Sequence, residues 1–327
     1  MLIRFFKNNN PSSFILLPLF ALVLWIIVFF AEQNIIVGDQ MPLYETIAKP
    51  LNNFHFIATI IAYLLIISGA FLLNFIVNKY EILTKPSFLP ALFYIVFMSM
   101  DSTMLTLHPF IFSNIFIMLA IYKLVSSYQK DTAFSNAFDA GILFSLSSLF
   151  YFPSIVFIPL LGIGFILFRP FNWREWIISS LGLLVPYIFV FSYYFLKETP
   201  GNWWNIKVFL SHIPEQPKPV ISSSFYFMSG VSMLIISLAF MKLFTGFYEA
   251  SQRNKKGILL LVWLSAFALL SLFIAPQVSI ENYSALAIPA SVFCANYFLK
   301  IKKKWWGELL FILLLASIFI HHFFTLF

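Results

Sequence analysis

Residues 56–77 read FIATIIAYLLIISGAFLLNFIV, a continuous apolar run without one charged side chain. A helix of this length rises about 33 Å at ~1.5 Å per residue, which is enough to cross the ~30 Å hydrocarbon core of a bilayer. The bias extends along the chain, since 61% of the 327 residues are hydrophobic and 10% are charged, whereas a soluble domain carries about 25% charged residues. A soluble protein of this size could not bury so much apolar surface. The sequence therefore predicts an integral membrane protein.

Apolar runs of roughly 17–25 residues mark candidate transmembrane helices. We place eleven of them, at 14–31, 56–77, 87–106, 110–126, 136–152, 154–168, 177–195, 221–240, 257–275, 285–299 and 306–324. The predicted fold class is all-α, a single polytopic membrane domain over residues 1–327 with about eleven transmembrane helices and short interfacial helices. The hairpin 136–168 is ambiguous, because its two runs are short and meet at Phe152-Pro153 with almost no loop. It is either a tilted pair of spans or a re-entrant pair.

Basic residues indicate the orientation of these helices. Under the predicted topology sixteen of the 20 Lys and Arg residues lie on the side of the N-terminus and four, Lys49, Lys197, Lys207 and Lys218, lie on the other. The positive-inside rule places the basic side in the cytoplasm. We therefore expect a multi-pass protein of a bacterial inner membrane, with a cytoplasmic N-terminus and a periplasmic C-terminus. The formal charge of +7 is explained by this asymmetry, and no nucleic-acid partner is predicted.

Two segments on the outer side are long enough to contain structure, residues 32–55 and 196–219. In the first, Pro42 suits the first turn of a helix and Pro50 ends it. In the second, Trp203, Ile206 and Leu210 recur at helical spacing. This pattern predicts a short helix over residues 202–213 that lies in the membrane interface with its aromatic side towards lipid.

The motifs of soluble enzymes are absent from the sequence. It contains no Walker loop, GxGxxG, HExxH or GxSxG pattern and no paired cysteines, which argues against ATP-driven transport and against a soluble nucleotide-sugar domain. The five histidines are expected at helix ends or in loops rather than on facing helix surfaces, so an oxygenase with two irons is disfavoured. No metal or resident cofactor is predicted.

Acidic residues on the outer side are the candidates for chemistry: Asp39, Glu45 and Asp101. If the helix that begins near Ser87 continues for about twenty residues, Asp101 lies in the outer leaflet, where a carboxylate is costly and usually faces a cavity or a partner. If the helix ends near Met100, Asp101 caps the next turn among the headgroups. Asp39 has an equally ordinary alternative as the residue that caps a short helix.

The first 170 residues resemble polyprenyl-phosphate-sugar-dependent glycosyltransferases of the C-type fold. The resemblance rests on Asp39 with Tyr44 and Glu45 in the first outer loop, on the short interfacial helix, and on the hairpin AGILFSLSSLFYFPSIVFIPLLGIGFILFR that ends at Arg169. The whole chain also resembles a family of uncharacterised multi-pass membrane proteins from Bacteroidota. The first resemblance implies an enzyme that transfers a sugar from a polyprenyl-phosphate donor to an envelope acceptor at the outer face of the inner membrane.

In such an enzyme a carboxylate removes the proton of the acceptor hydroxyl, and cations hold the lipid phosphate. Asp39, Glu45 and Asp101 are the implied catalytic residues, and Lys207, His212 and Lys49 are the implied phosphate ligands. The ordinary role of such cations is anchoring at the interface. A second interpretation of the chain is a non-enzymatic scaffold or accessory subunit of an envelope assembly, whose partners would be lipids and other membrane proteins. A carrier ranks third, because no inverted repeat is visible.

The predicted topology can be tested with reporter fusions. A fusion after Lys256 should give a cytoplasmic signal and a fusion at Phe327 an external one, because the basic loops stay inside. A cytoplasmic signal at Phe327 would mean that one span has been miscounted.

Overall fold

The computed structural model describes residues 2–7, 10–30, 41–196, 223–243, 251–274 and 280–326, which are helical apart from turns and contain no strand. The α-helices are α1 (Leu2–Lys7), α2 (Ser12–Phe30), α3 (Pro42–Leu51), α4 (His55–Lys79), α5 (Leu89–Met98), α6 (Pro109–Ser126), α7 (Phe134–Phe150), α8 (Pro159–Phe168), α9 (Trp173–Leu196), α11 (Ser223–Leu243), α12 (Gln252–Ile274), α13 (Ala287–Lys300) and α14 (Lys304–Leu326). Three 3-10 helices are η1 (Ser102–Leu105), η2 (Phe152–Phe157) and η3 (Ile280–Leu286). The predicted interfacial helix 202–213 lies outside the described residues.

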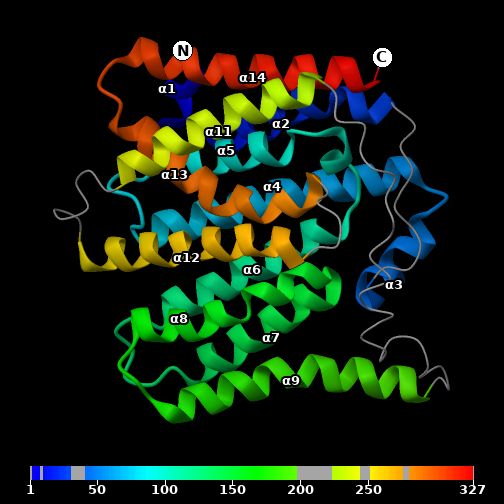
Figure 1. The fold of residues 1–327 in the computed structure, drawn as a ribbon, viewed down its shortest axis with the longest axis vertical. Coiled ribbons are helices and arrows are strands. Elements are labelled where there is room, and N and C mark those ends of the chain that lie inside the picture. Colours follow the sequence, from blue (N-terminus) through cyan, green and yellow to red (C-terminus); the bar gives the residue numbers. More distant parts are fainter. Residues whose placement is uncertain are drawn as a thin grey trace.

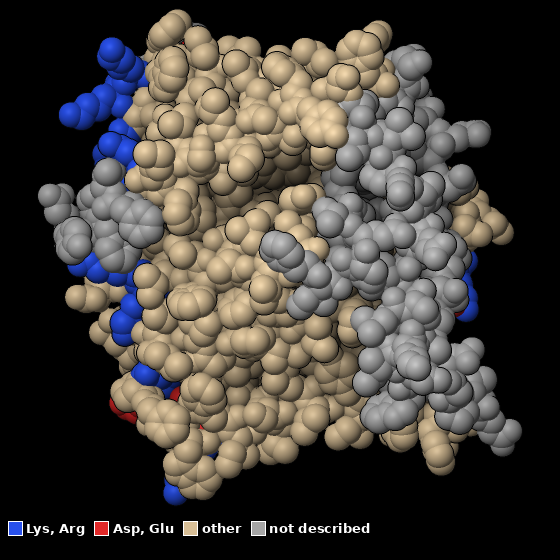
Figure 2. Space-filling view, in the orientation of Figure 1, with Lys and Arg blue, Asp and Glu red and all other residues tan. Residues whose placement is uncertain are grey.

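The long helices run roughly side by side, with α14 along one margin of the molecule and α9 along the opposite margin (Figure 1). Lys and Arg side chains gather at one edge of the structure, on the left of Figure 2. Helix α4 ends at Lys79, Lys123 lies in the last turn of α6, and Arg253 lies in the first turn of α12. The described chain therefore has one strongly basic edge, as the distribution of Lys and Arg predicted.

Six of the described helices are long and apolar enough to cross a membrane: α4, α6, α9, α11, the Gln252–Leu272 part of α12, and the Trp305–Phe324 part of α14. Each of the eleven predicted runs contains helix. In the remaining five the apolar helix covers fewer than 18 residues, as in the Ser12–Ile26 part of α2 and in α5. The length criterion therefore supports a membrane protein with six candidate spans and does not confirm eleven.

The run 87–106 differs most from the prediction, because it is not one continuous helix. Helix α5 ends at Met98 after ten residues, all of them buried, and η1 follows after a turn. At ~1.5 Å per residue α5 covers only about half of the hydrocarbon thickness. Four of the next five residues, Ser99, Asp101, Ser102 and Thr103, are of types whose short polar side chains compete for backbone hydrogen bonds and favour turns. A short central helix packed on α4 and α13 therefore gives way to irregular backbone inside the protein.

The hairpin 136–168 consists of α7, the 3-10 helix η2 and the ten-residue helix α8. Pro153 lies in the first turn of η2 and Pro159 is the first residue of α8, positions where a missing backbone N–H costs little. The second half of the hairpin is thus a divided element, which explains the shortness of its apolar run.

Two glycines allow α7 and α9 to approach at backbone distance. A Cβ atom on Gly182 would meet the carbonyl oxygen of Phe138, and one on Gly141 would meet the carbonyl of Ser179 and lie 2.9 Å from the backbone nitrogen of Leu183. Close helix crossings in membranes depend on such small residues. Since backbone atoms cannot move aside as a flexible side chain can, neither position has room for alanine.

We predict that Gly182→Ala and Gly141→Ala each lower the thermal stability of the purified protein in detergent, by about 1–3 kcal/mol, through overpacking. Gly230→Ala on α11 is the matched control, because its Cβ would meet nothing within 4 Å. Equal melting temperatures for Gly182→Ala and Gly230→Ala would contradict the close α7–α9 crossing.

Candidate functional site

The irregular segment after α5 is rich in polar residues that are shielded from solvent. Ser99, Asp101, Thr106 and His108 are all buried. The Asp101 carbonyl accepts the backbone N–H of Met104 at 3.1 Å, and the side chain of His108 caps α6 by accepting from Phe110 N at 3.4 Å. In a membrane, such backbone is tolerated only where the protein itself satisfies it or where it lines a cavity.

Asp101 pairs with a histidine from the far end of the chain. Its Oδ2 lies 3.0 Å from Nε2 of His321, and both side chains are almost fully buried, with 6% and 2% of their surfaces exposed. On the other side of the ring, His321 Nδ1 lies 3.1 Å from Ser224 Oγ. Three segments, the turn before η1, the last turns of α14 and the first turn of α11, thus contribute to one row of polar groups. His322 packs beside the His321 ring, with centroids 6.3 Å apart.

The helices α2 and α3, which flank the predicted first outer loop, both bond to the segment that carries Asp101. The indole Nε1 of Trp25, on α2, donates to Ser99 Oγ at 3.2 Å. The hydroxyl of Tyr44, on α3, donates to the carbonyl of Leu107 at 2.8 Å. Both side chains are fully buried, so α2 and α3 are fixed against this segment. Asp39, between α2 and α3 in sequence, lies outside the described residues.

The other predicted site residues lie apart from the Asp101–His321 pair or outside the described residues. Glu45 forms an ion pair with Lys49 one turn away on α3, and this contact raises the pKa of Lys49. Each of the two residues therefore has its ion-pair partner within α3. Lys207 and His212 lie outside the described residues. Within the described part of the chain no group of three or more His, Cys, Asp or Glu residues could hold a metal ion.

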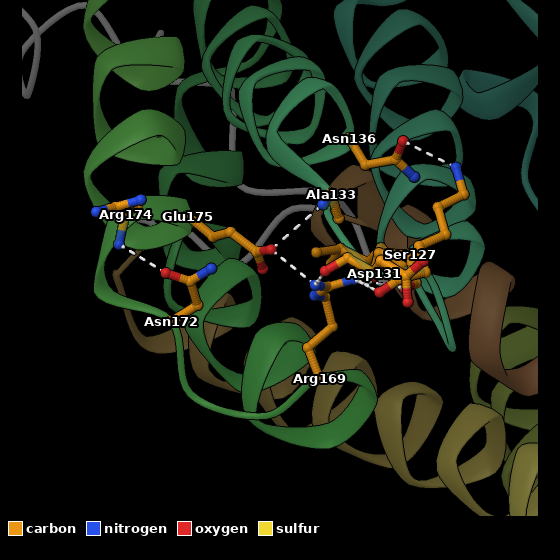
Figure 3. A network of polar contacts seen from close by, with 10 residues as sticks. Ser127, Asp131, Ala133, Asn136, Arg169, Asn172, Arg174 and Glu175 are labelled. Atoms are coloured by element: carbon orange, nitrogen blue, oxygen red, sulfur yellow. Dashed lines mark hydrogen bonds and ion pairs between the residues drawn. The ribbon is translucent and has the colours of Figure 1, made fainter.

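A second buried ion pair lies where the hairpin ends, and its contacts identify it as structural (Figure 3). Arg169 Nη2 lies 2.8 Å from Glu175 Oε1. The same guanidinium donates to the carbonyls of Ser127, Lys130 and Asp131 at 3.1, 2.6 and 3.1 Å. These carbonyls belong to the turn that follows α6, where backbone acceptors lack helical partners. Arg169 therefore fastens the α6–α7 turn to the start of α9.

The sequence matches one family model over residues 35–327, that of a family of unknown function, DUF6427. The chain belongs to DUF6427. Searches of the curated proteins and of the solved structures found no match. The matched region of this DUF6427 chain includes Asp39, Asp101, Ser224 and His321.

The sequence points to Asp101 but not to His321, its partner, or to Ser224, the partner of His321. Residues 220 and 97 positions apart along the chain share no local pattern. The one usable signal was the His321-His322 pair near the end of an apolar run, where ionisable residues are rare.

The Asp101–His321 pair in this DUF6427 protein predicts strong energetic coupling. Asp101→Asn and His321→Gln should each destabilise the purified protein by about 1–3 kcal/mol, since each leaves a buried polar group poorly matched. The double variant should lose much less stability than the sum of the losses in the two single variants, because either change alone removes the interaction. Additive shifts of the melting temperature would show that the two side chains do not interact.

Proposed function

We propose that this protein is a membrane transferase that moves a sugar from a polyprenyl-phosphate donor to an acceptor hydroxyl at the outer face of the bacterial inner membrane. The observation that carries the proposal is the buried Asp101–His321 pair on irregular backbone, held against the elements that flank the first outer loop. A carboxylate–imidazole pair buried among membrane helices is costly, and such residues usually mark a functional pathway or site.

In the proposed reaction Asp101 is the general base. Its carboxylate takes the proton of the acceptor hydroxyl, the acceptor oxygen bonds to the anomeric carbon, and the bond from that carbon to the phosphate oxygen breaks. Polyprenyl phosphate leaves with the electron pair. His321 is a positioning residue, since one ring nitrogen faces Asp101 Oδ2 and the other faces Ser224 Oγ, which fixes the plane of the ring.

The donor phosphate requires cations on the same side of the membrane. Lys49 is the described candidate, and it would exchange Glu45 for the phosphate when the donor binds. Lys207 and His212 are the other proposed ligands. Asp39 is the second candidate for the base, because it precedes α3, which is fastened to the Asp101 segment through Tyr44.

The proposal includes a topology of eleven crossings. The basic edge lies in the cytoplasm together with the N-terminus, and Asp101 lies in the outer half of the membrane. Helix α5 starts at the loop after Lys79 and ends ten residues later, so the segment that follows it continues towards the outer face.

A scaffold or accessory subunit is the alternative function. The observation that favours it is the large apolar surface of α9, of which the membrane-length window is 17% buried. Such a surface suits lipid or a partner helix equally. The two functions differ in whether a change at Asp101 that preserves the fold abolishes a chemical reaction.

Membranes that contain Asp101→Asn should transfer sugar about 10²–10⁴-fold more slowly than wild type, because the amide cannot accept the hydroxyl proton. The assay offers polyprenyl phosphates that carry labelled glucose, mannose or N-acetylglucosamine, and measures label in envelope glycans. Asp39→Asn in the same assay identifies the base, and Glu45→Gln tests the ion pair with Lys49. His321→Gln, which keeps a donor towards Asp101, should retain more activity than His321→Ala.

Lys85→Gln, a change at an exposed residue of the basic edge, is the control and should leave transfer unchanged. If Asp101→Asn and Asp39→Asn both transferred sugar at the wild-type rate, at equal protein levels, the enzymatic function would be excluded and the scaffold function favoured.

A further inference from the structure

Three basic side chains at the ends of two helices on the basic edge lie against aromatic rings rather than acids. Lys79 Nζ lies 4.9, 5.8 and 5.2 Å from the ring centroids of Phe75, Tyr80 and Tyr122. The guanidinium carbon of Arg253 lies 4.9 Å from the centroid of the same Tyr80 ring. Lys256 Nζ lies 4.8 Å from the ring of Tyr128. We call Lys79, Arg253 and Lys256 the α4–α12 cation cluster.

The fold brings this cluster together from separate helices. Asn254, next to Arg253, donates to the carbonyl of Glu81 at 3.5 Å, which holds the start of α12 against the turn after α4. Gly257 packs closely against Ile82 of the same turn, because a Cβ atom added at Gly257 would lie only 3.0 Å from Ile82 Cγ1. The cations therefore have fixed neighbours.

Within the described part of the chain no ion pair joins any of these three cations to a carboxylate, and the ion pairs Lys123–Asp139 and Arg169–Glu175 involve other residues. The phenol of Tyr80 provides no counter-charge either, because burial raises its pKa to about 12. The Nε–H of Arg253 is buried and has no hydrogen-bond acceptor among the described residues. Positive-inside sorting explains why basic residues lie at this edge, but it does not explain why two cations share one ring without an acid.

We propose that the α4–α12 cation cluster binds the phosphate headgroup of an anionic phospholipid of the inner leaflet. The phosphate oxygens accept hydrogen bonds from Arg253 and from the two ammonium groups, and the rings orient the cations through cation–π contacts. Basic pockets between helices on the cytoplasmic side are suited to such headgroups. The acyl chains lie along apolar side chains such as Phe75, which is 50% exposed on α4.

The test uses native mass spectrometry of the full-length protein in detergent, titrated with phosphatidylglycerol and, separately, with phosphatidylethanolamine. Wild type should retain phosphatidylglycerol preferentially. The triple variant Lys79→Gln, Arg253→Gln, Lys256→Gln should bind it at least about tenfold more weakly, since each cation contributes to headgroup attraction. The single variant Lys256→Gln, at the half-buried residue that does not share the Tyr80 ring, should show a smaller loss and preserves the measurement if the triple variant fails to fold.

The matched control removes the same charge elsewhere on the basic edge, through Arg4→Gln, Lys302→Gln and Lys303→Gln, all at exposed residues. It should retain phosphatidylglycerol. Equal loss in control and cluster variants would mean that binding depends on total charge, and undiminished binding in the cluster variant would place the lipid elsewhere. Displacement of the lipid by millimolar inorganic phosphate or AMP would show a site for a soluble phosphate. Each of these three results overturns the proposal.

Discussion

Irregular backbone inside a membrane protein must find all its hydrogen bonds within the protein, because hydrocarbon offers neither donors nor acceptors. Residues 99–108 impose this requirement here, between the end of α5 and the start of α6. Trp25, Tyr44 and His321 reach this segment from three other helices. The break in α5 therefore dictates how α2, α3 and α14 pack, and the same contacts bury Asp101 beside an imidazole.

The length of α5 separates the two faces of the molecule. Because α5 stops after ten buried residues, its packing on α4 and α13 ends at Met98. The polar side chains of Ser99, Asp101 and Thr106 follow on irregular backbone and are also buried. The acid–histidine pair and the α4–α12 cation cluster thus occur at opposite ends of the same helical assembly, so the protein can contain both sites.

Much of the fold follows from the sequence, because helix positions depend on local patterns. Each predicted apolar run contains helix, and Pro42 and Leu51 bound α3 near the expected places. The break after Met98 was harder to predict, since propensity differences of a few tenths of a kcal/mol decide whether a polar turn interrupts an apolar run. The contacts of Asp101 with His321 and of His321 with Ser224 were not predictable in this way. His321 lies 220 residues from it, and only tertiary packing relates the two.

Assembly of the Asp101 pair requires the C-terminal helices. Ser224 and His321 belong to α11 and α14, which pack against one another, while Asp101 follows α5. Without α14, Asp101 lacks this partner, and in the proposed topology a lone carboxylate at membrane depth costs about 2.5–3.5 kcal/mol on insertion scales. Docking of α14 supplies the partner that offsets this cost. The polar row therefore forms only when α11 and α14 pack against the segment after α5, and its burial couples the stability of these C-terminal helices to the proposed chemistry of that segment.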